Sequence, residues 1–265
     1  MRQGGSTHTA IRDEIKAARK DLVENGTFKE KVAYFFDYYA IHTIVIAVIL
    51  IFTVAFIYHQ VTKPEIVFNG LLLNVLSFEE GNPVEDLESG FMDYIDMNTK
   101  EYDFSVNSSL IYKLGDDSGQ TQMNDYQSSQ AIMTLCSAGA VDFISSPLDS
   151  ILEYGYGDLI ANLEDVLTEE ELEKYRPYFL YADLTVVKQK AEAFDNNIKA
   201  SDIPCPDPTK PEEMKEPIPI FIDVSKCEKM ANIYDYSSDT IVVAFAANAP
   251  NRDRFPDFLA YIFEE

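Results

Sequence analysis

The chain has few of the residues that enzymes and metal sites most often use. Tryptophan is absent, and the three histidines, His8, His42 and His59, all lie in the first 60 of the 265 residues. The rest of the chain therefore has no histidine for a Ser-His-Asp triad or a zinc site. The GxSxG, P-loop and GxGxxG motifs are absent as well. We expect a non-catalytic protein that uses no cofactor and no metal ion.

Cysteine is also scarce. Cys136, Cys205 and Cys227 are an odd number without CxxC spacing, which argues against a zinc site and a dense disulfide framework. Cys136 lies in an apolar helical stretch and is expected to be a small buried side chain. Cys205 and Cys227 could pair in an oxidising compartment. The sequence leaves both the paired and the free state open.

Basic residues are few, because 21 Lys and Arg stand against 45 Asp and Glu, for a net charge of −24. Residues 1–39 have a net charge of +1, so the acidic excess lies in residues 40–265, at −25. Such a charge repels nucleic acid and anionic lipid headgroups, and it attracts cations and basic partners. It also keeps an exposed surface soluble. We expect no nucleic-acid partner.

One long apolar run interrupts the acidic sequence, from Ala40 to Val61, without a charged residue. At 1.5 Å per residue, a helix of this length matches the roughly 30 Å hydrocarbon core of a bilayer. Aromatic residues at both ends, among them Tyr34 and Tyr58, are typical of helix ends at headgroup level. Residues 40–61 are therefore predicted to be a transmembrane helix embedded in the lipid bilayer.

The distribution of lysines around residues 40–61 predicts how the helix is oriented across the membrane. Lys20, Lys29 and Lys31 precede the run and Lys63 follows it, so the positive-inside rule favours a cytoplasmic N-terminus. The run is longer than the apolar region of a signal peptide, and no Ala-x-Ala-like site follows it. We expect a type II single-pass protein of the cell membrane whose residues 62–265 form an extracellular domain.

Residues 1–39 are expected to be a cytoplasmic segment. Apolar residues recur every three or four positions from Ile11 to Leu22, which predicts an amphipathic helix. Thr27 and Glu30 form a capping-box pattern that starts the next helix. The first helix either lies on a membrane or partner surface or has no role of its own.

The domain at 62–265 opens with alternating strands and helices. The expected elements are strands over 66–75, 104–112 and 141–145, a helix from Pro83, and a helix over 122–138 that Gly139 ends. This order predicts an α/β fold with a parallel sheet.

After Pro147 the pattern is less regular. The expected elements are short helical pieces over 149–165, a capped helix from Thr168, a proline-rich loop over 195–219, strands over 218–224 and 241–246, and an apolar helix from Phe255 to Phe263.

The run AIMTLCSAGAVDFISSPLDSILEYGYGDLIANLEDVLTEEELEKY, residues 131–175, resembles the middle of bacterial extracellular solute-binding proteins of ABC transporters. In that family a helix ends in a small-Gly-small turn before a strand with Asp at its second position, here Asp142. The later runs IPIFIDVSKC and DTIVVAFAANAPNRDRFPDFLAYIF resemble the return strand and the closing strand and helix. The resemblance covers about residues 66–263 and implies a periplasmic-binding-protein-like lobe.

The chain departs from that family in three ways. The region of the second lobe is reduced to residues 147–217, tryptophan is absent, and a transmembrane helix stands in for the lipoprotein cysteine. The layout resembles single-pass proteins of Gram-positive bacteria that have one truncated, membrane-anchored solute-binding lobe. The resemblance therefore implies a fixed domain rather than a shuttling transport receptor.

A ligand site in such a sheet is expected at the carboxyl ends of the strands. Hydroxyl, amide and carboxylate groups there can bind small molecules, although the same residues also cap turns. The candidates are Asn74, Ser77, Ser145, Ser146, Asp149 and Asp223.

Two functions remain open at this point. The first is a membrane-anchored, solute-binding-like protein that recognises a small molecule or an envelope protein. The alternative is a structural interaction module of a membrane complex that has no small-molecule ligand. A pocket at the candidate residues would favour the first, and a filled cleft with an exposed apolar patch elsewhere would favour the second.

Overall fold

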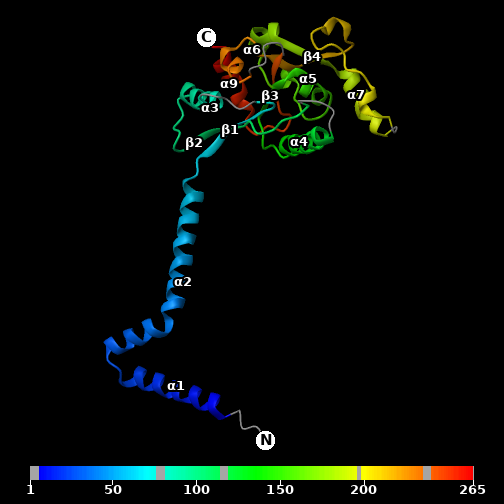
Figure 1. Cartoon of the computed structure of the whole chain (residues 1–265). Coiled ribbons are helices and arrows are strands. Elements are labelled where there is room, and N and C mark those ends of the chain that lie inside the picture. Colours follow the sequence, from blue (N-terminus) through cyan, green and yellow to red (C-terminus); the bar gives the residue numbers. More distant parts are fainter. Residues whose placement is uncertain (1–5, 76–80, 114–118, 196–197, 235–239, 265) are drawn as a thin grey trace. The chain divides into compact units, whose positions relative to one another are not determined.

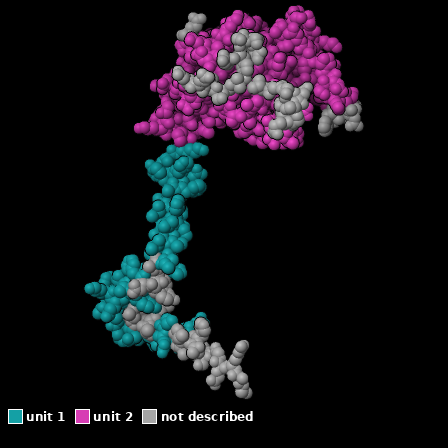
Figure 2. All heavy atoms as spheres, viewed as in Figure 1, with its two compact units in different colours: residues 1–63 teal, residues 64–265 magenta. Residues whose placement is uncertain are grey.

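The computed structural model describes residues 6–75, 81–113, 119–195, 198–234 and 240–264 (Figure 1). The chain divides into two compact units, Met1–Lys63 and Pro64–Glu265 (Figure 2). Both hydrophobic core clusters lie entirely within the second unit. This unit therefore has a core of its own, as an independently folding domain requires.

The first unit consists of the helices α1 (Ser6–Asn25) and α2 (Phe28–Thr62). The predicted capping box is confirmed, because Glu30 N donates to Thr27 Oγ1 and Thr27 N donates to Glu30 Oε2. Within α2, the 22 residues Ile41–Thr62 are long and apolar enough to cross a membrane, judged by length and composition alone. None of their apolar window is buried.

The second unit is built on a six-stranded mixed sheet in the order β2-β1-β3-β6-β5-β4. The strands are β1 (Glu65–Leu72), β2 (Tyr102–Asn107), β3 (Phe143–Pro147), β4 (Phe179–Asp183), β5 (Pro217–Asp223) and β6 (Ile241–Phe245). The pairs β1–β2 and β1–β3 are parallel, as predicted. The pairs β3–β6, β6–β5 and β5–β4 are antiparallel, so the all-parallel expectation holds for one half of the sheet.

Two details differ from the sequence prediction. The expected strand over 104–112 ends at Asn107, because the backbone that follows turns back over the end of β1 and bonds to Asn74. Strand β4, in the region expected to be a reduced second lobe, joins the same sheet. Its five residues are too few to show a clear alternation in the sequence.

Helices cover both faces of this sheet. They are α3 (Pro83–Tyr94), α4 (Gly119–Ser137), α5 (Leu148–Ile151), α6 (Glu169–Tyr175), α7 (Leu184–Asp195), α8 (Glu228–Ala231) and α9 (Phe255–Phe263). In β3, Phe143 packs into the cluster beneath α3 and α9, whereas Ile144 packs into the cluster beneath α4. Neighbouring residues of a strand face opposite sides, so the second unit has three layers.

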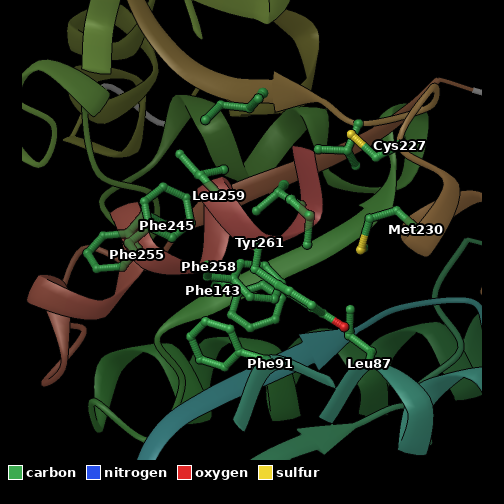
Figure 3. Packing of buried hydrophobic residues seen from close by; sticks show 14 of the residues in the cluster. Leu87, Phe91, Phe143, Cys227, Met230, Phe245, Phe255, Phe258, Leu259 and Tyr261 are labelled. Atoms are coloured by element: carbon green, nitrogen blue, oxygen red, sulfur yellow. The ribbon is translucent and has the colours of Figure 1, made fainter. Parts of the chain in front are cut away.

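Phenylalanine dominates the core beneath α3 and α9. The Phe68 ring stacks on that of Phe143 at 5.2 Å and lies 5.5 to 5.7 Å from those of Phe91, Phe104 and Phe258. The ring centroids of Phe143 and Phe258, a residue of α9, are 4.3 Å apart, and Figure 3 shows the two rings next to each other. We call these five side chains the phenylalanine cluster.

The turn before β3 explains the motif that suggested a family. Gly139 has φ +64°, and a Cβ there would lie 2.8 Å from the carbonyl oxygen of Asn248. The buried Asp142 accepts hydrogen bonds from the backbone of Asn69 and Asn251, both at 2.8 Å. Glycine and aspartate therefore have structural roles at this turn.

Replacing Phe258 by alanine removes a ring from the phenylalanine cluster and leaves a cavity. We expect Phe258→Ala to lower the free energy of unfolding of residues 64–265 by about 3–5 kcal/mol. Ile198→Ala, at an exposed side chain, should change it by less than about 0.5 kcal/mol. Urea titrations followed by circular dichroism measure both, and equally small changes would contradict the role of the cluster.

The Asp183 carboxyl is expected to make the free energy of unfolding of the second unit depend on pH. Burial raises the pKa of its carboxyl, but hydrogen bonds from Lys215 N, Thr185 and Glu216 N outweigh burial and lower the pKa from 3.8 to about 2. The stabilisation is therefore complete well above pH 3.8 and is lost as the pH falls through 3.8 towards 2. We expect Asp183→Asn to cost about 1.5–3 kcal/mol at pH 7.

Urea midpoints of the wild type and Asp183→Asn, measured from pH 7 down to the acid limit of the fold, test this. The difference should shrink below pH 4. A difference that is constant with pH would show that the charge of Asp183 is not involved.

Candidate functional site

The carboxyl ends of β1, β3 and β5 lie at one edge of the sheet, because these three strands run in the same direction. Five of the six predicted site residues are described there: Asn74, Ser145, Ser146, Asp149 and Asp223. Ser77 lies outside the described residues. We call the edge of the sheet at which β1, β3 and β5 end the carboxyl edge.

Asn74 is fully buried and holds a neighbouring segment in place. Its Nδ2 donates to the Tyr112 carbonyl and to Ser150 Oγ, each at 2.9 Å, and its Oδ1 accepts from Tyr112 N at 2.7 Å. Its own backbone N–H donates to the Leu110 carbonyl at 3.0 Å. The side chain and the backbone of Asn74 together therefore hold residues 110–112 across the end of β1.

The two serines are also buried. Ser146 Oγ donates to the Pro147 carbonyl at 3.0 Å. The Ser145 carbonyl accepts from Tyr234 Oη at 2.9 Å, while Ser145 Oγ has no hydrogen-bond partner among the described residues. Neither hydroxyl is presented to solvent.

The two aspartates differ from each other. Asp223 Oδ1 accepts from Ser225 N at 2.9 Å and Ser225 Oγ at 2.6 Å, and Ser225 Oγ accepts from Ile241 N. Asp223 therefore organises the connection from β5 to β6. Asp149 is exposed at the start of α5. Among the five described residues, Asp149 is exposed, Asp223 is half-buried and the other three are buried.

A groove of about 500 Å³ lies beside the carboxyl edge, between α4 and the end of β2. It is lined by Asn107, Leu110, Gln127, Gln130, Ala131, Thr134 and Leu135. All seven residues are uncharged, and we call this the uncharged groove. These residues were not among the predicted site residues.

Both walls of the uncharged groove are anchored in the fold. Ile132 and Cys136 of α4 are buried against the sheet. Ser128, on the same side of the helix, donates to the Ile111 carbonyl at 2.7 Å. Asn74 holds the adjoining backbone at Leu110. The groove is therefore preformed, which lowers the entropic cost of binding.

The surface around the groove is nearly free of charge and combines polar amide and hydroxyl side chains with two exposed large side chains, Tyr126 and Met133. Tyr126 and Met133 are 60% and 50% exposed, and each lies one turn from Gln130, whose side chain bonds to Tyr126 Oη. Residues 107–112 and α4 together contain one charged residue, Asp125, whereas 25% of the whole chain is charged. Asp125 accepts from Lys113 N at 2.8 Å. This low charge density is visible in the sequence itself.

The thiols add no reactive site to this surface. All three cysteines are free, and Cys136 and Cys227 are buried. Burial raises the pKa of both to about 11. Thiols of this kind are poor nucleophiles near neutral pH.

The chain matches no protein-family model, and comparisons with curated proteins and with solved structures gave no match. The resemblance to solute-binding proteins therefore stays a prediction.

Asn74 and Asp149 allow the structural role of the carboxyl edge to be measured. We expect Asn74→Ala to lower the free energy of unfolding of residues 64–265 by about 2–4 kcal/mol, since it removes the partner of the part-buried backbone N–H and carbonyl of Tyr112 and of the buried Ser150 hydroxyl. Asp149→Ala should change it by less than about 0.5 kcal/mol. Comparable stabilities in urea titrations would contradict the structural role of Asn74.

Proposed function

We propose that this chain is a membrane-anchored, non-catalytic interaction protein. In this proposal α2 crosses the cell membrane, residues 1–39 face the cytoplasm, and the second unit lies outside the cell. There the second unit binds another envelope protein through the uncharged groove. The nearly uncharged surface of α4 in an otherwise acidic second unit is the observation that carries the proposal.

The exposed apolar window of α2 supports the membrane anchor. Ile41–Thr62 would be about 33 Å long as a straight helix, close to the thickness of the hydrocarbon core. In water, an apolar surface of this length would be a strong aggregation site. Lys29 and Lys31 before the window support a cytoplasmic N-terminus.

The composition of the groove supports binding to a protein. The centres of protein interfaces are depleted of charge and enriched in aromatic residues and methionine, as is the surface formed by Tyr126, Gln130 and Met133. A bilayer surface fits less well, because the lining offers no basic residue for anionic headgroups.

Charge defines the kind of partner. Residues 64–265 carry a net charge of −26, so a second copy of this unit is repelled, whereas a basic protein is attracted from a distance. We therefore infer a partner of positive net charge whose contact surface has an uncharged centre. Basic residues around that centre would face the acidic surface of this chain.

Site-specific photo-crosslinking in the membranes of producing cells tests the proposal. A photoreactive residue at Gln130 of the full-length chain should give one discrete protein adduct, and the same residue at the exposed Ile198 should not. Met133→Glu should lower the yield at position 130 about tenfold or more, because the new charge must lose water on binding. Mass spectrometry of the adduct should identify a protein of positive net charge.

Equal labelling at both positions, an adduct to lipid, or an adduct to a second copy of this chain would each contradict the proposal. Circular dichroism of Met133→Glu should match the wild type, since Met133 is half exposed.

A further inference from the structure

A second pocket lies at the opposite edge of the sheet. It has a volume of about 330 Å³ and lies where β5 begins and the chain leaves β6. This volume is at the lower end of the range for small-molecule sites. The predicted residues of the carboxyl edge do not line it, and we call it the amino-edge pocket.

The floor of the amino-edge pocket is apolar. Ile218 and Ile220 come from β5, and Ile160 comes from the segment that bridges to Ala246 after β6. Ile160 and Ile220 are buried. At Gly155, which also lines the pocket, a Cβ would lie 2.9 Å from the ring of Phe221, so the backbone closely approaches β5.

Charged residues of both signs line the same pocket. Arg252, Asp158 and Asp165 are exposed lining residues, which puts them at its mouth. Arg252 Nη2 donates to the Ala247 carbonyl, which holds the guanidinium group beside the end of β6 and uses one of its five N–H donors. Among the described residues, no ion pair within 4.0 Å joins Arg252 to either aspartate.

A ligand that has a carboxylate, an ammonium group and an aliphatic side chain would complement these lining residues. An arginine fork binds a carboxylate with two parallel hydrogen bonds, and an aspartate binds an ammonium group. An apolar floor accepts an aliphatic side chain. We propose that the amino-edge pocket binds a small apolar amino acid, with its carboxylate at Arg252, its ammonium group at Asp158 and Asp165, and its side chain against the isoleucines.

The proposal is independent of the uncharged groove, because the two sites share no residue. It adds a small-molecule ligand to a domain that also binds a protein.

Isothermal titration of residues 64–265 with L-alanine, L-valine, L-leucine, L-isoleucine and L-methionine tests the proposal. At least one should bind saturably. If L-leucine binds, 4-methylpentanoate, which lacks the amine, and 3-methylbutylamine, which lacks the carboxylate, should each bind about ten- to hundredfold more weakly, since each loses charge-assisted hydrogen bonds. For another amino acid, the corresponding acid and amine are used.

Two variants locate the site. Arg252→Gln should weaken binding of the amino acid about ten- to hundredfold and leave the affinity for the amine analogue unchanged. Arg254→Gln removes the same charge two residues away, where Arg254 pairs with Asp257 at 3.4 Å outside the pocket, and should bind like the wild type. Thermal unfolding of both variants establishes that they are folded.

Absence of saturable binding by all five amino acids would overturn the proposal, as would binding that Arg252→Gln leaves unchanged. An acid analogue that binds as tightly as the amino acid would overturn the assignment of the ammonium group to Asp158 and Asp165.

Discussion

Phe68 lies in the first strand of the sheet, and its ring contacts phenylalanines from α3, β2, β3 and the last helix, α9. The phenylalanine cluster therefore joins the beginning of the second unit to its end. Closing so long a stretch of chain has a large entropic cost, which burial of several aromatic rings offsets. Helix α4 packs on the other face of the sheet, and its outward side is the surface that we propose for binding.

The polar groups of the second unit follow a common pattern. Asp142, Asp183 and Asp223 each accept backbone N–H groups where a strand begins or ends, and Asn74 does so after β1. Residues that can bind ligands at strand ends are here part of the turns that hold the strands. Because these side chains are engaged in contacts within the fold, the uncharged groove and the amino-edge pocket are the better candidates for binding.

Much of the secondary structure could be predicted from the sequence, because local signals specify it. The capping boxes at Thr27 and Thr168 are confirmed, as are the helix that begins at Pro83 and the parallel order of β1, β2 and β3. Strand β4 was missed because it is short, and the direction of β6 could not be predicted because it depends on which strand it pairs with. The groove was also missed, since its walls at Leu110 and Gln130 are distant in sequence.

The apolar window of α2, the acidic charge of the second unit and the low charge of α4 follow from the amino-acid sequence alone, because composition and periodicity are local properties. Which polar residues stay exposed to solvent depends on how distant segments pack in the folded chain. Asn74 and Asp149 have similar positions in the sequence pattern, after β1 and after β3. Their roles differ because residues 110–112 fold back onto Asn74, whereas Asp149 stays in solvent. Such a contact between distant segments exists only in the folded chain.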